Sequence, residues 1–253
     1  MKIKACFSFL ISALLITMAS VAFASPTAPI DIVFDIDWTT FYTAHPDKPN
    51  QGDDKVIIVE GKAYRPTDHL GEVLEKISSR PDVRISFFSG GERSRNETLL
   101  KAFKLPSGRS AYDIAYKVLS KENLTTVSED ASLGFSERYK KSMAGILPGA
   151  TAERTILVDD QVNFSVKPWK AVASLGVFNF QKEFDASKAN EAYFPKSKEE
   201  WRAERDKALM WQALLEEALS SSNAHKKQSF AQIAEDLWAQ KSHRGLCKNI
   251  FAD

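Results

Sequence analysis

Two aspartates with one residue between them, Asp35 and Asp37, follow directly after a short apolar segment. In a β-strand, residues two apart point to the same side, so both carboxylates would enter one site. One carboxylate can then attack phosphorus to give an aspartyl-phosphate, while the other works first as an acid and then as a base. Taken alone, the pair is equally well explained by a turn with two solvated aspartates.

Groups that suit a phosphoryl ligand occur at two later positions. Ser89 follows a second apolar segment, and its hydroxyl together with the Gly90 amide can hold a phosphoryl oxygen. Lys141, with Lys140 beside it, can neutralise the attacked phosphate. Each has a common alternative, which is a strand-terminating turn for Ser89 and a solvated side chain for either lysine.

A second acidic pair, Asp159 and Asp160, follows a third apolar segment. With Asp35 these acids offer oxygen ligands, and Mg²⁺ favours a few carboxylates together with water and phosphate oxygens. We therefore expect a magnesium site in which either Asp159 or Asp160 is the direct ligand. Adjacent acids are a weak sign individually, and the order of all these groups along the chain is the specific signal.

The apolar segments have the composition of strands that are buried on both faces. Such strands are predicted at 30–36, 83–88, 155–158 and 172–180. Their alternation with helical segments predicts an open, mostly parallel α/β sheet. Reactive residues gather beyond the carboxyl ends of the strands in such sheets, and both acidic pairs and Ser89 stand there.

Smaller elements are expected between these strands. Glu60-Gly61 lies between two short β-type segments, which indicates a hairpin over 56–65. The apolar residues of 70–77 have helical spacing. Residues 96–149 are predicted to form helices and loops.

The composition changes beyond Pro195, where two amphipathic stripes are separated by Ser220–Asn223. The stripes consist of Trp211, Leu214, Leu215 and Ala218, and of Phe230, Ile233, Ala234 and Leu237. We interpret this region as helices packed on the sheet domain. The alternative is an apolar surface that binds a protein partner.

The N-terminal residues have the layout of a secretory signal peptide. Lys2 and Lys4 precede an apolar run over 5–22, and Ala22 and Ala24 form a small-residue cleavage pattern. We expect cleavage after Ala24, export to the periplasm or medium, and no permanent membrane anchor. A retained anchor is the alternative, because the run is nearly long enough to span a bilayer.

Charge and cysteine content limit the classes of function. The chain has 34 basic and 33 acidic residues, and loss of Lys2 and Lys4 would leave 32 against 33. This balance argues against binding nucleic acid through bulk charge. Of the two cysteines only Cys247 would survive cleavage, so no internal disulfide is expected.

The order of motifs resembles the haloacid dehalogenase (HAD) superfamily over residues 30–180. The resemblance implies that Asp35 is the nucleophile and that Asp37 protonates the leaving oxygen and then activates water. It implies that Ser89 and Lys141 bind the phosphoryl group. A second acid at position 37 is typical of the phosphatase and phosphotransferase members.

The same resemblance implies the ligands of the cofactor. Asp159 or Asp160 would hold Mg²⁺ together with Asp35 and the backbone carbonyl of Asp37.

Three segments are similar to the NIF-like branch, which includes the RNA polymerase C-terminal-domain phosphatases. They are Tyr64-Arg65-Pro66, Phe87-Phe88-Ser89 and Tyr139-Lys140-Lys141. Members of this branch carry a small β insertion instead of a large cap, which suits the 56–65 hairpin. The periplasmic class B acid phosphatases are a second relative to consider, given the signal peptide and the sequence 34–37.

Several residues near the motifs are candidates for substrate contacts. Besides Gly90, they are Arg95 and Asn96, just past Ser89, and Trp38 beside the acidic pair. Trp38 is either a ring that narrows the site or stacks on substrate, or a core residue. Arg95 and Asn96 are equally compatible with an exposed first helical turn.

These observations predict an α/β protein with a Rossmann-like HAD core, a mostly parallel sheet, a small β-hairpin insertion and a helical C-terminal extension. The expected boundaries are 1–24 for the signal peptide, 25–194 for the catalytic domain and 195–253 for the extension. The predicted activity is Mg²⁺-dependent hydrolysis of a phosphoprotein or a small phosphomonoester. The alternatives are a phosphotransferase and an exported binding or effector protein that uses its C-terminal helices.

Overall fold

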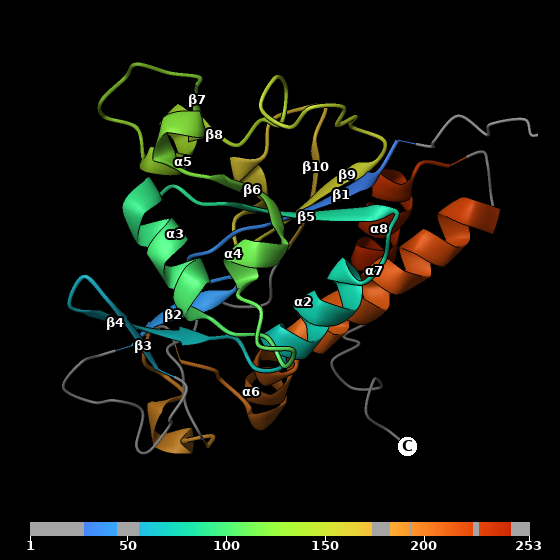
Figure 1. The fold of residues 1–253 in the computed structure, drawn as a ribbon. Helices are drawn as coiled ribbons and strands as arrows, with labels where there is room; N and C mark the ends of the chain where they lie inside the picture. The colour runs from blue at the N-terminus through green and yellow to red at the C-terminus, as the bar shows by residue number, and fades with distance from the viewer. Residues whose placement is uncertain (1–27, 45–55, 174–182, 193, 225–227, 244–253) are drawn as a thin grey trace, which may run out of the picture.

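Five parallel strands form the central sheet. The computed structural model describes residues 28–44, 56–173, 183–192, 194–224 and 228–243. The order of the five strands in the sheet is β10-β9-β1-β5-β6 (Figure 1). The strands span Ile30–Phe34 (β1), Val83–Phe88 (β5), Ala115–Leu119 (β6), Thr155–Asp159 (β9) and Lys170–Ala173 (β10). This arrangement confirms the predicted α/β class and the mostly parallel sheet.

Helices and short strands surround this sheet. The longer helices are α2 (Leu70–Ser78), α3 (Arg93–Ala102), α6 (Lys198–Arg205), α7 (Lys207–Ala224) and α8 (Phe230–His243). The short helices are α4 (Ala111–Ile114), η3 (Lys121–Asn123), α5 (Phe135–Arg138), η4 (Val162–Phe164) and η5 (Ala186–Lys188). The strands outside the main sheet are β2 (Phe41–Ala44), β3 (Ile57–Val59), β4 (Lys62–Pro66), β7 (Thr125–Thr126) and β8 (Tyr139–Lys140).

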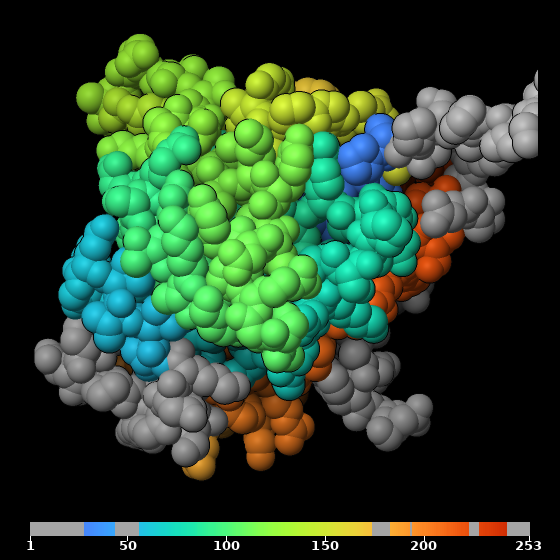
Figure 2. All heavy atoms as spheres, in the orientation of Figure 1, coloured from blue at the N-terminus to red at the C-terminus, as the bar shows by residue number. Residues whose placement is uncertain are grey.

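Strand β1 is the centre of the sheet and is buried along its whole length. It pairs with β5 on one side and β9 on the other, and Phe34 lies level with Phe87 and Val158. The residues that follow these three strands therefore emerge together at one edge of the sheet. On the face drawn in Figure 2, the blue start of the described chain forms a small patch beside the grey atoms.

Alternate residues of β1 face two different layers, as the pleat of a strand requires. Ile32 and Phe34 pack in the larger apolar cluster with residues of α2, α7 and α8. Figure 1 shows these three helices on one side of the sheet. Val33 packs on the opposite face with Met143 and Leu147, which belong to an irregular segment.

The predicted hairpin is present as β3 and β4, and a third antiparallel strand extends it. The order is β2-β4-β3, and Tyr42 lies opposite Arg65. The polar composition of 43–54 had concealed β2, whose first residues are apolar and buried. The first strand of this small sheet, β2, follows directly after the Asp35–Asp37 segment in the chain.

The edge strand β6 was missed, because 96–149 was expected to hold only helices and loops. Tyr116 and Lys117 in the middle of the strand are both exposed, and only Leu119 is buried, so no uninterrupted apolar run marks the strand. The predicted strand at 172–180 begins earlier, at Lys170, and its residues 174–180 lie outside the described residues.

The apolar stripes of the C-terminal region are buried against the sheet domain. Trp211 packs on Phe34 with ring centroids 5.9 Å apart, and α8 contacts β9 and β10. The predicted separator Ser220–Asn223 is helical and belongs to α7. Serines are tolerated there because the apolar stripe on the other side of the helix supplies the stability.

The predicted signal peptide at 1–24, the residues 45–55 and Cys247 lie outside the described residues. Within the described ranges, every helix is too short or too polar to cross a membrane.

Replacing Leu215 with alanine should reveal the contribution of α7 to stability. Its side chain is fully buried in the larger cluster. Leu215→Ala is therefore expected to lower the free energy of unfolding by about 2–5 kcal/mol in urea titrations. The exposed Ser220→Ala on the same helix should change it by less than about 0.5 kcal/mol. Equal effects of the two substitutions would contradict the packing described for α7.

Candidate active site

A buried lysine joins the acids that follow β1 and β9. Lys141 Nζ lies 2.5 Å from Asp35 Oδ1 and 2.7 Å from Asp159 Oδ2, and all three side chains are almost completely buried. Burial opposes the charge of Lys141, yet the two carboxylates hold its pKa above the ordinary value. The ammonium therefore stays charged and stabilises the two carboxylates.

The position of Lys141 is fixed by its backbone and by aromatic rings. Its backbone N–H donates to the Phe164 carbonyl at 2.7 Å. Its ammonium lies 5.0 Å from the ring centroid of Phe164 and 5.8 Å from that of Phe88, which are cation–π distances. Lys140 instead donates to the Asn163 carbonyl at an exposed position, so Lys141 is the one of the two lysines that contacts Asp35 and Asp159.

The second carboxylate, Asp37, is held by Ser89 and Arg95. Ser89 Oγ donates to Asp37 Oδ2 at 2.6 Å, and Arg95 Nη1 and Nη2 donate to Oδ1 and Oδ2 at 2.6 and 2.7 Å. Burial alone would raise the pKa of Asp37, but the bidentate Arg95 and the Ser89 hydroxyl lower it. Asp37 is thus ionised and fully bonded in this conformation.

The loop that carries these acids is an unusual turn. Trp38 has φ 63°, in the left-handed region that non-glycine residues rarely adopt. Its N–H donates to the Phe41 carbonyl at 2.8 Å, and Thr40 Oγ1 donates back to the Asp35 carbonyl at 2.8 Å. Thr39 Oγ1 accepts from the Asp160 N–H at 2.9 Å, which ties this loop to the end of β9.

Asp35, Asp159 and Asp160 have the donors that a hard cation needs. One carboxylate oxygen from each lies within 4.8 Å of the others. Asp35 Oδ2 is buried and has no hydrogen-bond partner, so it can accept a metal bond without losing another contact. These residues therefore fit Mg²⁺, which prefers carboxylate oxygens.

The charges of this cluster lead to the same conclusion. Burial raises the pKa of Asp35 well above its ordinary value, Lys141 opposes this, and Asp159 and Asp37 add to it. Burial and the Asp159 charge raise the pKa of Asp160 to about 6. Lys141 is the cation in contact with Asp35 and Asp159, so a divalent cation would relieve the excess negative charge.

The loop after β5 depends on glycine at two positions. The Gly91 N–H donates to Ser89 Oγ at 2.8 Å. A Cβ on Gly90 would lie 2.9 Å from the Phe135 ring, and one on Gly91 would lie 1.7 Å from Arg95 Nη2. Close packing of Arg95 on this loop therefore requires the absence of a side chain at Gly91.

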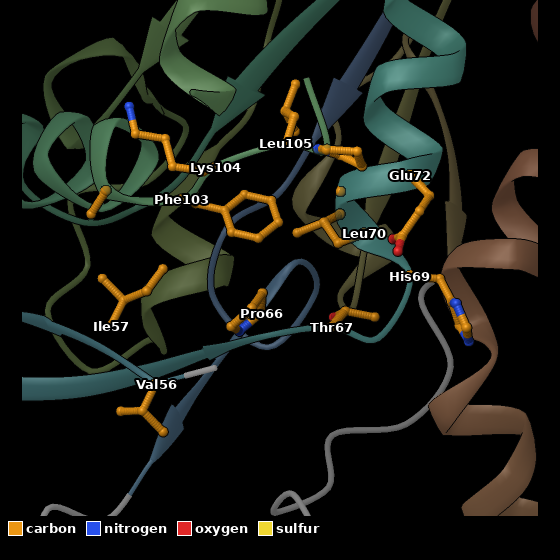
Figure 3. Close-up of a pocket in the computed structure, with 13 residues that line it drawn as sticks. Val56, Ile57, Pro66, Thr67, His69, Leu70, Glu72, Phe103, Lys104 and Leu105 are labelled. Carbon is orange, nitrogen blue, oxygen red and sulfur yellow. The ribbon is translucent and has the colours of Figure 1, made fainter. Parts of the chain in front are cut away.

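A cavity of about 570 Å³ opens beside Asp37. Its walls come from the small sheet and from the loop after β5, and include Lys62, Tyr64, Gly91 and Arg95. A second cavity of about 400 Å³ lies between the small sheet, the start of α2 and the segment after α3. Figure 3 shows Leu70, Phe103 and Leu105 among the side chains that line this second cavity, which contains none of the acids of the site.

Most of the predicted site residues lie close together, whereas the side chain of Asn96 points elsewhere. Asn96 was expected to contact substrate, but its side chain is buried and its amide donates to Ser120 Oγ at 2.9 Å and to the Gly91 carbonyl at 3.3 Å. Asn96 therefore stabilises the loop after β5 through the Gly91 carbonyl. Trp38 is half-buried at the site, and its backbone conformation is its most distinctive feature.

Sequence reasoning missed three contributors to the site. The Phe164 ring lies against the Lys141 ammonium. Thr40 donates to the Asp35 carbonyl and so fixes the loop of residues 35–40, which we call the acidic loop. Lys207 Nζ lies 3.2 Å from the Trp38 carbonyl in the same loop. Lys207 lies one helical turn before Trp211 on the buried stripe of α7. This spacing was the sequence signal that could have indicated a buried lysine.

The solved structures that the chain is similar to include two phosphatases of the C-terminal domain of RNA polymerase II. The chain is similar to Fcp1, an essential phosphatase of this kind, at 18% identity and TM-score 0.39 over 75% of this chain and 54% of that one. It is similar to fission yeast Fcp1 bound to beryllium fluoride at 14% identity and TM-score 0.41, over 94% of this chain and 67% of that one. The chain thus spans about half the length of the first structure.

Neither family models nor curated proteins match the chain. The two structures belong to the class that the motifs resemble.

Asp160→Asn should change stability in a pH-dependent way. Because the folded protein keeps a proton on Asp160 up to about pH 6, the contribution of this group to the free energy of unfolding falls as pH rises from about 4 to 6. In EDTA at pH 7.5 we expect the variant to be more stable by about 1–2 kcal/mol, allowing for partial exposure, and equal to wild type near pH 4.

Urea titrations at both pH values measure this difference, and Glu129→Gln at an exposed position is the control. Added Mg²⁺ should stabilise wild type more than the Asp160→Asn protein, since a ligand that binds only the folded state adds its binding free energy. A pH-independent difference, or equal stabilisation by Mg²⁺, would contradict this account of the acidic cluster.

Proposed function

We propose that the protein is a Mg²⁺-dependent phosphomonoester hydrolase that works through an aspartyl-phosphate on Asp35. The observation that carries the proposal is the 2.5 Å contact between Asp35 and the buried Lys141, beside a second carboxylate in a different environment. Burial raises the pKa of Asp35, while Arg95 and Ser89 outweigh burial and lower that of Asp37. These directions are the reverse of the two roles, so the proposal requires a cation beside Asp35 and the departure of Arg95 from Asp37.

In the first step the Asp35 carboxylate attacks phosphorus. The bond from phosphorus to the leaving oxygen breaks, and Asp37 gives that oxygen a proton. Lys141 and the Ser89–Gly91 loop surround the position where the phosphoryl oxygens would lie. When bound, Mg²⁺ would supply positive charge for the phosphoryl oxygens, held by Asp35, the Asp37 carbonyl and Asp159 or Asp160.

In the second step the Asp37 carboxylate takes a proton from water. The resulting oxygen attacks phosphorus, inorganic phosphate leaves, and the Asp35 carboxylate is restored. Asp37 must be protonated at the start of each cycle, whereas Arg95 holds it ionised. We infer that Arg95 leaves Asp37 when a phosphate group offers a new anionic partner, since a partly buried guanidinium is costly without one.

The open cavity and the small sheet favour a substrate whose leaving group extends away from the site. A phosphoprotein side chain and a small phosphomonoester both satisfy this condition. The predicted signal peptide supports export to the periplasm or medium as part of the proposal.

The nucleophile is tested with p-nitrophenyl phosphate and a phosphotyrosine peptide, each with Mg²⁺ or EDTA. Asp35→Asn should lower kcat by at least about 10³-fold, because amide oxygen is a poor nucleophile. The matched control is Asp82→Asn, before β5, where the acid pairs with Arg80 at the surface. This control should keep kcat within about threefold of wild type. An active Asp35→Asn protein would refute the proposal.

The role of Arg95 is tested by its effect on the pH profile. Arg95→Met removes the group that lowers the pKa of Asp37, so this pKa should rise. Because Asp37 must carry a proton to act as the acid, the fall of kcat/KM on the alkaline side should move to higher pH. KM should rise by about tenfold through loss of a phosphate contact. Arg95→Lys keeps the charge and should move the profile less, and an unchanged profile in Arg95→Met would contradict this role.

A further inference from the structure

Lys207 is a second fully buried lysine close to the site, and the steps above do not use it. It begins α7, in the C-terminal helical region, whereas the groups of the proposed mechanism lie between Asp35 and Asp160. Its ammonium lies 3.2 Å from the Trp38 carbonyl and 3.2 Å from Glu204 Oε1. It also lies 4.5 Å from the centroid of the Tyr42 ring and 5.8 Å from that of Trp211.

Burying this ammonium is costly, and an apolar residue at the same position would pack more cheaply. Burial lowers the pKa of Lys207, and the Glu204 carboxylate opposes this. The pair with Glu204 offsets the cost of burial, but it does not explain why the ammonium is directed at a backbone carbonyl. That carbonyl belongs to the acidic loop.

Trp38 is the residue of this loop whose conformation most needs support. A left-handed residue other than glycine costs about 1–2 kcal/mol, and Trp38 has φ 63°. The neighbouring Thr39 accepts two hydrogen bonds. Thr67 Oγ1 donates to its carbonyl at 2.8 Å, and the Asp160 N–H donates to its hydroxyl. Lys207 holds the carbonyl between Asp37 and Thr39.

We propose that Lys207 is a positioning residue for the reaction on Asp35, acting through the Trp38 carbonyl to fix the direction of Asp37 and its backbone carbonyl. The inference rests on the proposed function. It assigns to the C-terminal helices a part in the active site. A shift of about 1 Å in a reacting group can cost about 10²-fold in rate.

The experiment removes the donor without leaving a buried unpaired charge. Glu204→Leu/Lys207→Met replaces the ion pair as a whole, which is often neutral for stability. Lys207→Gln keeps an N–H donor in place of the ammonium and serves as the conservative variant. Leu215→Ala, buried on the same helix, is the control for lost stability.

Two measurements are made on the whole protein. The first is kcat and KM for p-nitrophenyl phosphate with Mg²⁺. The second is hydrogen exchange of the Trp38, Thr40 and Phe41 amides, which donate to backbone carbonyls within the loop. For the double variant we expect kcat to fall by at least about tenfold with KM within about threefold, and exchange to rise by at least about tenfold. Lys207→Gln should lie between it and wild type.

The double variant tests whether Lys207 positions the acidic loop or only stabilises the fold. If the double variant folds and keeps the kcat and loop exchange of wild type, Lys207 is a structural residue and the proposal is wrong. If the double variant does not fold, Lys207→Gln is compared with Leu215→Ala, and equal kcat and exchange in these two overturn the proposal. If wild type hydrolyses no phosphomonoester, the proposed function fails, and unchanged loop exchange would then also refute the positioning role.

Discussion

The site depends on one interaction, the contact of the Lys141 ammonium with Asp35 and Asp159. Removing one partner of a buried charge group costs about 3–5 kcal/mol, because the remaining charges lose their compensation. The ends of β1 and β9 must therefore meet the segment around Lys141, and the Phe88 and Phe164 rings must enclose it. The parallel register supplies this geometry, since it brings the carboxyl ends of the strands to one edge.

The two carboxylates of the first motif show how environment separates identical groups. Asp35 lies deepest, with one oxygen on Lys141 and the other without a hydrogen-bond partner. Asp37 is bonded through both oxygens to Arg95 and Ser89. The first arrangement suits a nucleophile that also binds a cation, and the second suits an acid–base group whose proton affinity changes when Arg95 moves.

Much of the fold followed from the sequence because β1, β5 and β9 are uninterrupted apolar runs. Strand β6 was missed because an edge strand has no such run. The choice between Lys140 and Lys141 required the structure, since neighbouring residues on a strand point to opposite sides. Asn96 was misplaced for a related reason, because a helix rotates successive side chains by about 100°, so the neighbour of Arg95 faces inward. Lys207 gave almost no sequence signal, as a lysine beside a helical stripe is usually solvated.

The distances in sequence between these contacts have a consequence for folding. Lys141 is 106 residues from Asp35, and Lys207 is 169 residues from Trp38. Contacts of such long range form late, because the entropy of closing large loops must be overcome before they contribute. During synthesis from the N-terminus, the strand that leads to Asp35 is made first, but its surroundings are incomplete until α7 has been made. The surroundings of the site are therefore complete only after α7 has been made, and fragments that end before Lys207 would contain the acids without this contact.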